Sequence, residues 1–319
     1  MSAICKLISK SWASNRSLTA LIIFSTVCLI ISLLGLCFDQ RLIMGENAWV
    51  KPVKFSASLA IYGMTLYWLA QYLTSYKVSF QKVCAAALVG AVAELSIIIG
   101  QVLRGASTHI NAGSPLDNVI AWIAAVAILP IAFGTIAIFF MLLRERSLPP
   151  VLGTALKWGV LLTVVGCIPG VMMLLPAAVQ ELIIHSKQIY AHAAGVPQIG
   201  GPGLPFLGWS TVSGDLRVAH FVGIHALQFF PVVAFLLMKF LPRVSTTRQE
   251  LLIGNIGATY LATIILLTRQ ALIAEPLTAP SHHTIAYAVL LALVSLNAAV
   301  YILCVPVTQD CPATRVRAS

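Results

Sequence analysis

The stretch "SGDLRVAHFVGIHALQFFPVVAFLLM", residues 213–238, decides the class of this protein. It ends in a continuous apolar run of the kind that crosses the hydrocarbon core of a bilayer. Before that run come Asp215, Arg217, His220, His225 and Gln228. Because ionisable side chains are costly in lipid, they generally face the interior of a protein. The stretch therefore predicts a spanning helix that lines a polar site.

The composition of the whole chain points to the same class. Of the 319 residues, 59% are hydrophobic and 9% are charged, whereas soluble domains have about 25% charged residues. The mean hydropathy is +0.93. Apolar runs of about 20 residues, each long enough to cross a bilayer, recur at 18–37, 54–75, 83–103, 118–143, 153–175, 217–240, 251–272 and 284–305. We expect an all-α, polytopic bundle of eight spans in a single integral membrane domain over residues 1–319, with an outer loop at 176–216.

The basic residues are unevenly divided between the two expected sides. With a cytoplasmic N-terminus, 13 of the 20 Lys and Arg residues fall on the cytoplasmic side, where only Glu145, Glu250 and Asp310 offset them. The other side holds seven basic and seven acidic residues. This asymmetry follows the positive-inside rule, so it predicts cytoplasmic termini and fits a bacterial inner (cytoplasmic) membrane. It also explains the net charge of +10 without a nucleic-acid partner.

The seven cysteines predict neither a disulfide nor a thiolate metal site. Most of them lie in expected spans or cytoplasmic tails, and none belongs to a CxxC motif. Disulfides form in oxidising compartments, and no pair of cysteines occupies an outer loop. The expected partners of the protein are the lipid bilayer and a small molecule bound on the outer side.

Polar side chains collect toward the outer ends of several spans. In the span 83–103 and just beyond it, Glu94, Gln101 and Arg104 are spaced by seven and three residues, so they share one helical face. The outer end of the next-to-last span brings Arg269 and Gln270 to the same level. We expect a pocket that opens to, or lies just under, the outer surface.

The opening stretch contributes a second polar face. If residues 217–240 form a straight helix, the side chains of Arg217, His220, His225 and Gln228 fall within an arc of about 140°. His220 and His225 are five residues apart, so they cannot easily bind one metal ion in the manner of an HxxxH motif. Each would need ligands from another helix, or one would serve as an axial haem ligand or quinone donor.

The candidate residues divide into three groups. Catalytic or proton-transfer roles are assigned to Glu94, His220 and Arg217. Metal or haem ligation is assigned to His109, His220 and His225. Ligand binding is assigned to Gln101, Arg104, Gln228, Arg269, Gln270, Lys51 and Trp49.

Structural explanations compete with these roles. Trp49 and Lys51 are equally well explained as anchors at the membrane interface. Asp215 is suited to cap the start of a helix. A purely structural polar network also accounts for the buried charges, with Arg217, Arg104 and Arg269 paired to Glu94, Asp215, Asp117 or Glu275.

Four segments of the chain resemble a group of bacterial multi-pass inner-membrane proteins of unassigned activity. The segments are "NAWVKPVKF" (47–55), "RGASTHIN" (104–111), "GGPGLPFLGWST" (200–211) and "GDLRVAHFVGIHALQ" (214–228). In that group the second segment is usually closer to SHFN, and a tryptophan precedes the glutamine that corresponds to Gln270. The resemblance implies where the site lies and leaves the reaction open.

The residues favour a membrane-embedded redox protein, or one that binds haem or a transition metal through His109, His220, His225 and Glu94. The alternative is a proton-coupled transporter, in which Glu94 and the histidines carry protons and the arginines hold a small or anionic substrate. A further alternative is an accessory or sensory membrane subunit.

Overall fold

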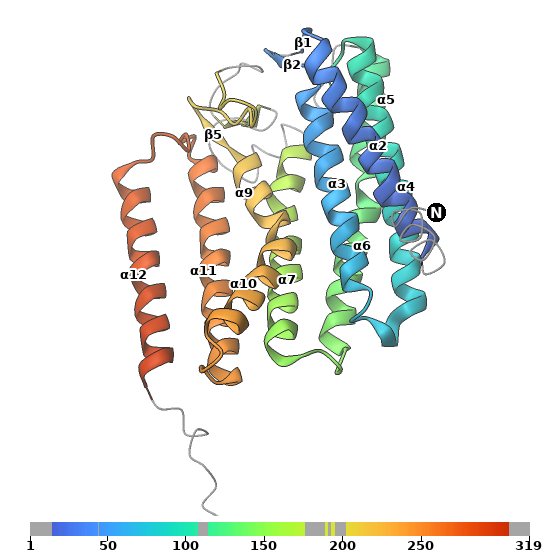
Figure 1. Ribbon diagram of the computed structural model, residues 1–319. Helices are drawn as coiled ribbons and strands as arrows, with labels where there is room; N and C mark the ends of the chain where they lie inside the picture. The colour runs from blue at the N-terminus through green and yellow to red at the C-terminus, as the bar shows by residue number, and fades with distance from the viewer. Residues whose placement is uncertain are drawn as a thin grey trace, which may run out of the picture.

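The computed structural model describes residues 15–43, 45–107, 114–175, 189–190, 193–194 and 202–305. It is an all-α bundle of long, roughly aligned helices (Figure 1). The helices are α2 (Arg16–Phe38), α3 (Val50–Leu69), α4 (Lys77–Arg104), α5 (Pro115–Ala127), α6 (Leu129–Arg144), α7 (Pro150–Leu174), α9 (Leu216–Ile224), α10 (Ala226–Phe240), α11 (Thr246–Leu272) and α12 (His282–Cys304), with a short 3-10 helix η1 (Thr74–Tyr76).

Short strands lie at one end of the bundle. They are β1 (Leu42–Ile43), β2 (Glu46–Asn47), β3 (Ile189–Tyr190), β4 (Ala193–Ala194) and β5 (Gly214–Asp215). β1 pairs with β2, and β3, β4 and β5 form a second antiparallel sheet in that order. We call this end, which lies at the top of Figure 1, the strand end; the opposite end, where α12 finishes, is the tail end.

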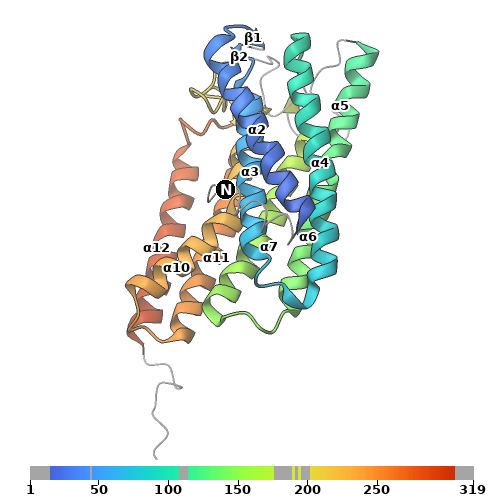
Figure 2. The same ribbon diagram turned by 45° about the vertical axis from the view of Figure 1, so that its right-hand side comes forward.

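Six segments of the described chain are long and apolar enough to cross a membrane. They are Arg16–Phe38, Thr74–Arg104, Pro115–Arg144, Pro150–Leu174, Thr246–Leu272 and His282–Cys304. The pair α9 and α10 makes a seventh if it is counted as one bent span. The predicted all-α membrane bundle is confirmed at this level. α3 runs through the same bundle beside α2 (Figure 2) but is not among these segments.

Polar caps mark where several helices begin. The side chains of Asn15, Ser114 and Ser281 accept hydrogen bonds from the first turns of α2, α5 and α12. Such caps satisfy backbone N–H groups that have no partner within the helix. At the end of α4, Gly105 adopts a left-handed conformation with φ of 69°, which a glycine adopts without steric cost.

Two of the expected spans are each made of two helices. The span 118–143 is divided at Ile128 into α5 and α6, although Pro115–Arg144 still counts as one segment that could cross a membrane. The expectation of one straight helix over 217–240 is wrong, because α9 and α10 meet at His225 with a bend of 49°. Pro169 lies inside α7, which stays one helix from Pro150 to Leu174.

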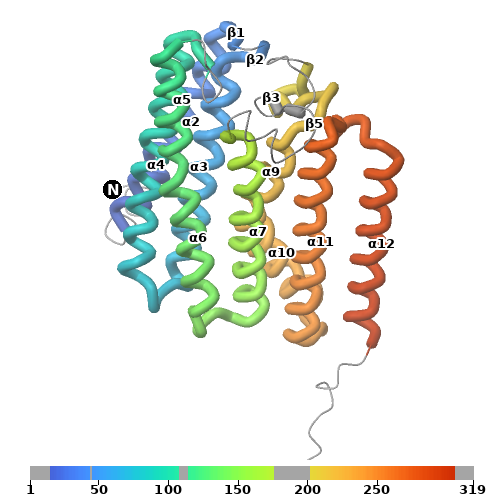
Figure 3. Tube along the Cα trace, turned by 180° about the vertical axis from the view of Figure 1, so that it is seen from behind, coloured from blue at the N-terminus to red at the C-terminus, as the bar shows by residue number. Residues whose placement is uncertain are grey.

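The helices pack as two groups. In the first half-bundle, α3 packs mainly on α2, and α4 packs on α2, α5 and α6. In the second half-bundle, α7 packs on α9, α10 and α11, and α12 packs on α11. The main helix contact between the two half-bundles is α6 against α7, as the view from behind shows (Figure 3).

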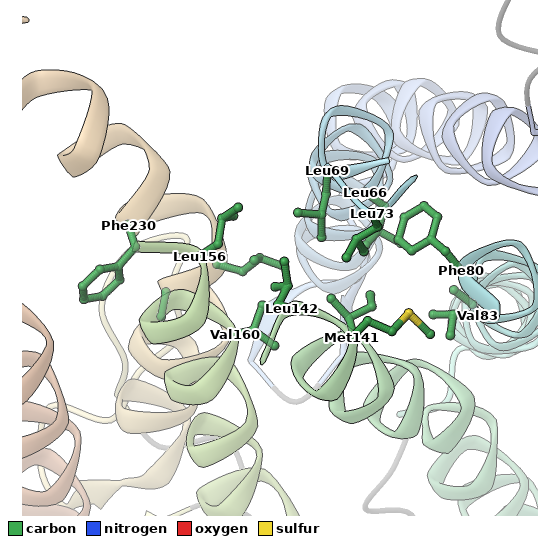
Figure 4. Close-up of a cluster of buried hydrophobic side chains, with 14 of the residues drawn as sticks. Leu66, Leu69, Leu73, Phe80, Val83, Met141, Leu142, Leu156, Val160 and Phe230 are labelled. Atoms are coloured by element: carbon green, nitrogen blue, oxygen red, sulfur yellow. The ribbon is translucent and has the colours of Figure 1, made fainter. Parts of the chain in front are cut away.

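An apolar core joins the half-bundles toward the tail end. Leu66, Leu69 and Phe80 come from the first half-bundle, and Leu156 and Phe230 come from the second. Figure 4 shows the side chains of α6 between these two sets. All five are almost completely buried. Burial of apolar surface thus closes the space between the half-bundles near the tail end.

Candidate functional site

A polar stripe runs down the face of α3. Lys51, Lys54, Ser58, Tyr62 and Thr65 are spaced so that, at about 100° per residue, they lie within an arc of about 80°. The opposite face of α3 is buried, and Gly63 there lies against Ile22 of α2. The stripe therefore turns away from α2.

The second half-bundle faces this stripe with polar groups of its own. Gln228 Nε2 donates a hydrogen bond to Thr65 Oγ1 over 3.4 Å. Cys167 lies near Tyr62, and Arg217 lies near enough to Lys51 and Lys54 for their like charges to repel one another. We call the region between the α3 stripe and these three residues, Cys167, Arg217 and Gln228, the seam.

Charged groups of both signs gather where the seam reaches the strand end. Lys51 lies close enough to the fully buried Glu94 of α4 to interact with its charge. Arg217 forms an ion pair with Asp215, with a closest distance of 2.7 Å, and its Nε also contacts both carboxylate oxygens. Asp215 is buried and also accepts bonds from the backbone N–H groups of Ser210 and Arg217. The Asp215 carboxylate therefore both caps α9 and neutralises the charge of Arg217.

The loop 202–213 is held against this charged cluster by both half-bundles. Lys54 Nζ donates to the carbonyl of Leu207 over 3.1 Å, and Arg217 donates to the carbonyl of Gly208. The carboxylate of Glu46 lies against the Cα of Gly208, which has a φ of 65°. A side chain at position 208 would meet both a left-handed backbone and this carboxylate, so the sequence must place glycine there.

The break between α9 and α10 is stabilised by neighbouring helices. Thr163 Oγ1 of α7 accepts from the backbone N–H of Leu227 over 3.1 Å and lies 3.5 Å from the carbonyl of Ile224. Tyr260 of α11 donates to the carbonyl of Val222. Within a membrane, backbone groups freed by a break need such partners.

Glycines bring α7 and the broken helix into close contact. Gly159, Gly166 and Gly170 share one face of α7 with Thr163. A methyl group at Gly166 would lie 2.5 Å from the Cα of Gly223. Small residues commonly permit this approach between membrane helices. The contact makes α7, α9 and α10 one tightly packed unit.

The two histidines of the opening stretch have different surroundings. His220 Nδ1 forms a 2.8 Å hydrogen bond with the carbonyl of Gly166 and lies over Gly170. His225 lies at the break itself. Its ring contacts the ring of Phe221 in a tilted arrangement, with 4.5 Å between the two centroids. Phe221 in turn contacts Trp209 of the loop. An aromatic series therefore connects the loop to the break.

His225 and Gln228 present hydrogen-bonding atoms at the break. Their side chains are close enough to interact, yet neither His225 Nε2 nor Gln228 Oε1 has a hydrogen-bond partner among the described residues. The amide orientation follows from Thr65, whose hydroxyl already donates to the carbonyl of Ile61 and so can only accept from Gln228. The amide oxygen of Gln228 is therefore left to interact with the neighbouring imidazole of His225.

The straight-helix arrangement expected for residues 217–240 is consequently wrong. The bend at His225 changes the direction of α10 relative to α9. Arg217 pairs with Asp215 of its own segment, and Glu94 instead neighbours Lys51. Polar groups from both sides of the break still reach the seam.

Several candidate ligand residues lie elsewhere. Gln101 accepts a bond from Arg104, which forms a 3.2 Å ion pair with Asp117 between α4 and α5. Gln270 is buried and donates to the carbonyl of Pro276. These contacts connect neighbouring segments, so the structure does not gather all the candidates into one pocket.

Trp49 and Arg269 also have separate environments. Trp49 is buried, donates to the carboxylate of Asp39 and packs on Gly35, so it attaches α3 to the end of α2. The guanidinium of Arg269 lies 5.3 Å from the ring centroid of Tyr287 in α12.

The proposed metal ligands do not form a cluster within the described part of the chain. No group of three or more His, Cys, Asp and Glu residues there is placed to hold a metal ion. His109 lies outside the described residues. His225 Nε2 has no hydrogen-bond partner among the described residues. This single nitrogen could ligate a haem iron or a metal ion, but it does not by itself form a multidentate metal site.

The sequence analysis did not identify the part of the seam that lies nearer the tail end, at Tyr62 and Thr65. Tyr62 and Thr65 continue the spacing that starts at Lys51 and Lys54, and this spacing could have revealed the stripe. Thr163 had no comparable signal, because a threonine hydroxyl in an apolar helix usually bonds to its own backbone.

A comparison of the chain with protein-family models, with curated proteins and with solved structures found no match. The assignment of a function therefore rests on the site itself.

Proposed function

We propose that the protein is a transporter of a small, polar or anionic substrate, and that the substrate passes through the seam. The proposal includes eight spans, with α3 as one and α9–α10 as another, and cytoplasmic termini, so that the strand end faces outward. This is the orientation that the distribution of Lys and Arg favours. It suits a bacterial inner membrane.

The single observation that carries the proposal is the broken helix beside a polar interface between two half-bundles. Transporters commonly place substrate groups at interrupted helices near the membrane midplane. Here the break exposes His225 and Gln228 next to the polar stripe of α3. Irregular backbone at this depth is tolerated where it is buried or lines a cavity.

The two ends of the seam are closed by different means. Loop 202–213 covers the strand end through Lys54 and Arg217. The apolar core around Leu69 and Leu142 closes the tail end. We propose that opening the loop admits substrate, that Lys51, Lys54 and Arg217 attract an anion, and that Glu94 and His225 exchange protons during the cycle.

Accessibility of Cys167 tests the proposal directly. The other six cysteines would be replaced, and intact cells would be treated with a membrane-impermeant thiol reagent. We expect little labelling of Cys167 while Lys54 holds the loop, and about tenfold faster labelling in Lys54→Ala, because losing one charge-assisted bond of about 1.5 kcal/mol shifts an opening equilibrium by that factor.

Arg41→Ala provides the matched control. Arg41 is also at the strand end, but it pairs with the exposed Asp39. Labelling should stay at the parental rate in this variant. If Cys167 stays unreactive in Lys54→Ala yet reacts after denaturation, the seam is not a route from outside and the transporter proposal is wrong.

A haem- or metal-dependent redox function is the second candidate, because His225 Nε2 has no partner among the described residues. An absorption spectrum and metal analysis of the purified protein distinguish the two. A near-stoichiometric haem or metal that is lost in His225→Ala would favour the redox function over transport.

We also propose that the chain belongs to the group of bacterial membrane proteins marked by NAWxKPxKF and GDLRxAHFxGxHALQ. The signatures include Lys51, Lys54, Asp215 and Arg217 at the strand end of the seam, and His225 and Gln228 at the break. The shared residues would then preserve the loop attachment and the break rather than a known catalytic motif.

A further inference from the structure

A shallow groove of about 530 Å³ lies between α7 and α11. Figure 3 shows these two helices side by side. Its apolar lining includes Val165, Ile168 and Met172 of α7, and Ile265 and Leu272 of α11. On α7 these residues lie roughly 120–180° around the helix from the glycine face that packs on α9. The groove is therefore separate from the seam.

The position and length of the groove match one leaflet of a bilayer. The lining residues extend from 165 to 172 and from 264 to 273, which is about 10–14 Å at 1.5 Å per residue. Half of a hydrocarbon core is about 15 Å thick. Ile168 and Ile265 are more than half exposed, so in a membrane they would contact acyl chains.

A cation stands near the strand end of this apolar groove. Arg269 belongs to the lining, and its guanidinium lies over the ring of Tyr287. Glu275 interacts with it electrostatically, but no carboxylate of the described residues lies within ion-pair distance of Arg269. A cation at the edge of lipid gains most from an anion that also arrives from the lipid side.

We propose that the groove is a binding site for an anionic phospholipid of the leaflet at the strand end. One acyl chain occupies the apolar groove, and the phosphate accepts hydrogen bonds from the guanidinium of Arg269. Arginine binds phosphate through parallel N–H groups.

Native mass spectrometry of the purified protein tests the site. The probes are phosphatidylglycerol and phosphatidylcholine with identical acyl chains, added at equal concentration. We expect the wild type to retain phosphatidylglycerol preferentially. Arg269→Gln should lower the ratio of the two bound lipids about tenfold, which is the loss expected for one hydrogen-bonded charge.

Three further variants and one displacement experiment make the result decisive. Arg269→Lys should recover part of the preference, and Arg41→Gln, at the same end, should leave it unchanged. Ile265→Trp should reduce binding of both lipids, because the indole fills the groove. Inorganic phosphate should not displace the lipid if the acyl chain contributes. An unchanged lipid ratio in Arg269→Gln, or displacement by phosphate alone, would overturn the proposal.

Discussion

The two faces of the broken helix α9–α10 are packed in opposite ways. Toward α7, glycine meets glycine, and Gly166 leaves no room for a methyl group beside Gly223. Toward α3, the contacts are polar and long, such as the 3.4 Å bond from Gln228 to Thr65. Close packing favours one fixed arrangement, whereas a sparse polar contact is easily exchanged for another partner. If the seam opens as proposed for transport, we expect α7 to stay with α9 and α10 and the separation to occur at α3.

The largest expected effect comes from filling the tight contact. Gly166→Ala forces α7 away from Gly223, because the added methyl group meets backbone atoms, and overpacking of this kind costs about 3 kcal/mol. The thermal unfolding midpoint in a mild detergent should fall sharply. Gly100→Ala is the matched control, because a methyl group there meets nothing within 4 Å. Equal effects of the two variants would contradict the tight contact.

A smaller effect is expected at the charged end of the seam. Glu94→Gln and Lys51→Met should each cost about 2 kcal/mol, between the values for exposed and fully buried ion pairs, because only Glu94 is fully buried. The double variant should cost clearly less than the sum, as interacting pairs do.

The same double-mutant cycle with Arg217 sharpens the distinction. Arg217 has Asp215 as its direct partner, so Glu94→Gln and Arg217→Gln should be additive to within about 0.5 kcal/mol. Stronger coupling of Glu94 to Arg217 than to Lys51 would mean that α9 and α4 share one ion pair across the seam.

Removing the polar contact across the seam should affect stability less. Gln228→Leu loses one long hydrogen bond and an amide oxygen without a partner among the described residues. Replacing such a group with an apolar one of similar shape is nearly neutral, so we expect a change within about 1 kcal/mol. Labelling of Cys167 in the Lys54→Ala background should nevertheless change. A large loss of stability would show that the seam is a packed interface.

The smallest effect concerns pH at the tail end, where the half-bundles are joined. Burial raises the pKa of Glu145, but hydrogen bonds from Ser147 and Ser75 outweigh it and hold the pKa below its usual range. A carboxylate with a lowered pKa stabilises the fold above its unfolded pKa of about 4.3, and this stability is lost as pH falls further.

Glu145→Gln tests this contribution. The melting temperature of the wild type should fall more between pH 6 and pH 3.5 than that of the variant. Glu250 of α11 also lies at the tail end and accepts a hydrogen bond from Thr154. The variant Glu250→Gln is the comparison for Glu145→Gln. Parallel pH curves for the wild type and Glu145→Gln would remove Glu145 as a link between η1 and the α6–α7 connection.

The sequence by itself determined the membrane class and most helix positions. Long apolar runs must form helices in lipid, because every backbone group there needs an internal partner. The polar positions within these runs also predicted that Glu94, Arg217 and Gln228 face the interior. These are local properties, and they depend on composition and spacing alone.

The tertiary structure decided which polar groups meet. A helical wheel treats residues 217–240 as straight, but Thr163 and Tyr260 on other helices satisfy the backbone freed at His225 and so permit the break. The ion-pair partner of Arg104 likewise depended on which helix ends became neighbours. Distance between helices is set by side-chain packing, as at Gly166 and Gly223, and no spacing within a single helix contains that information.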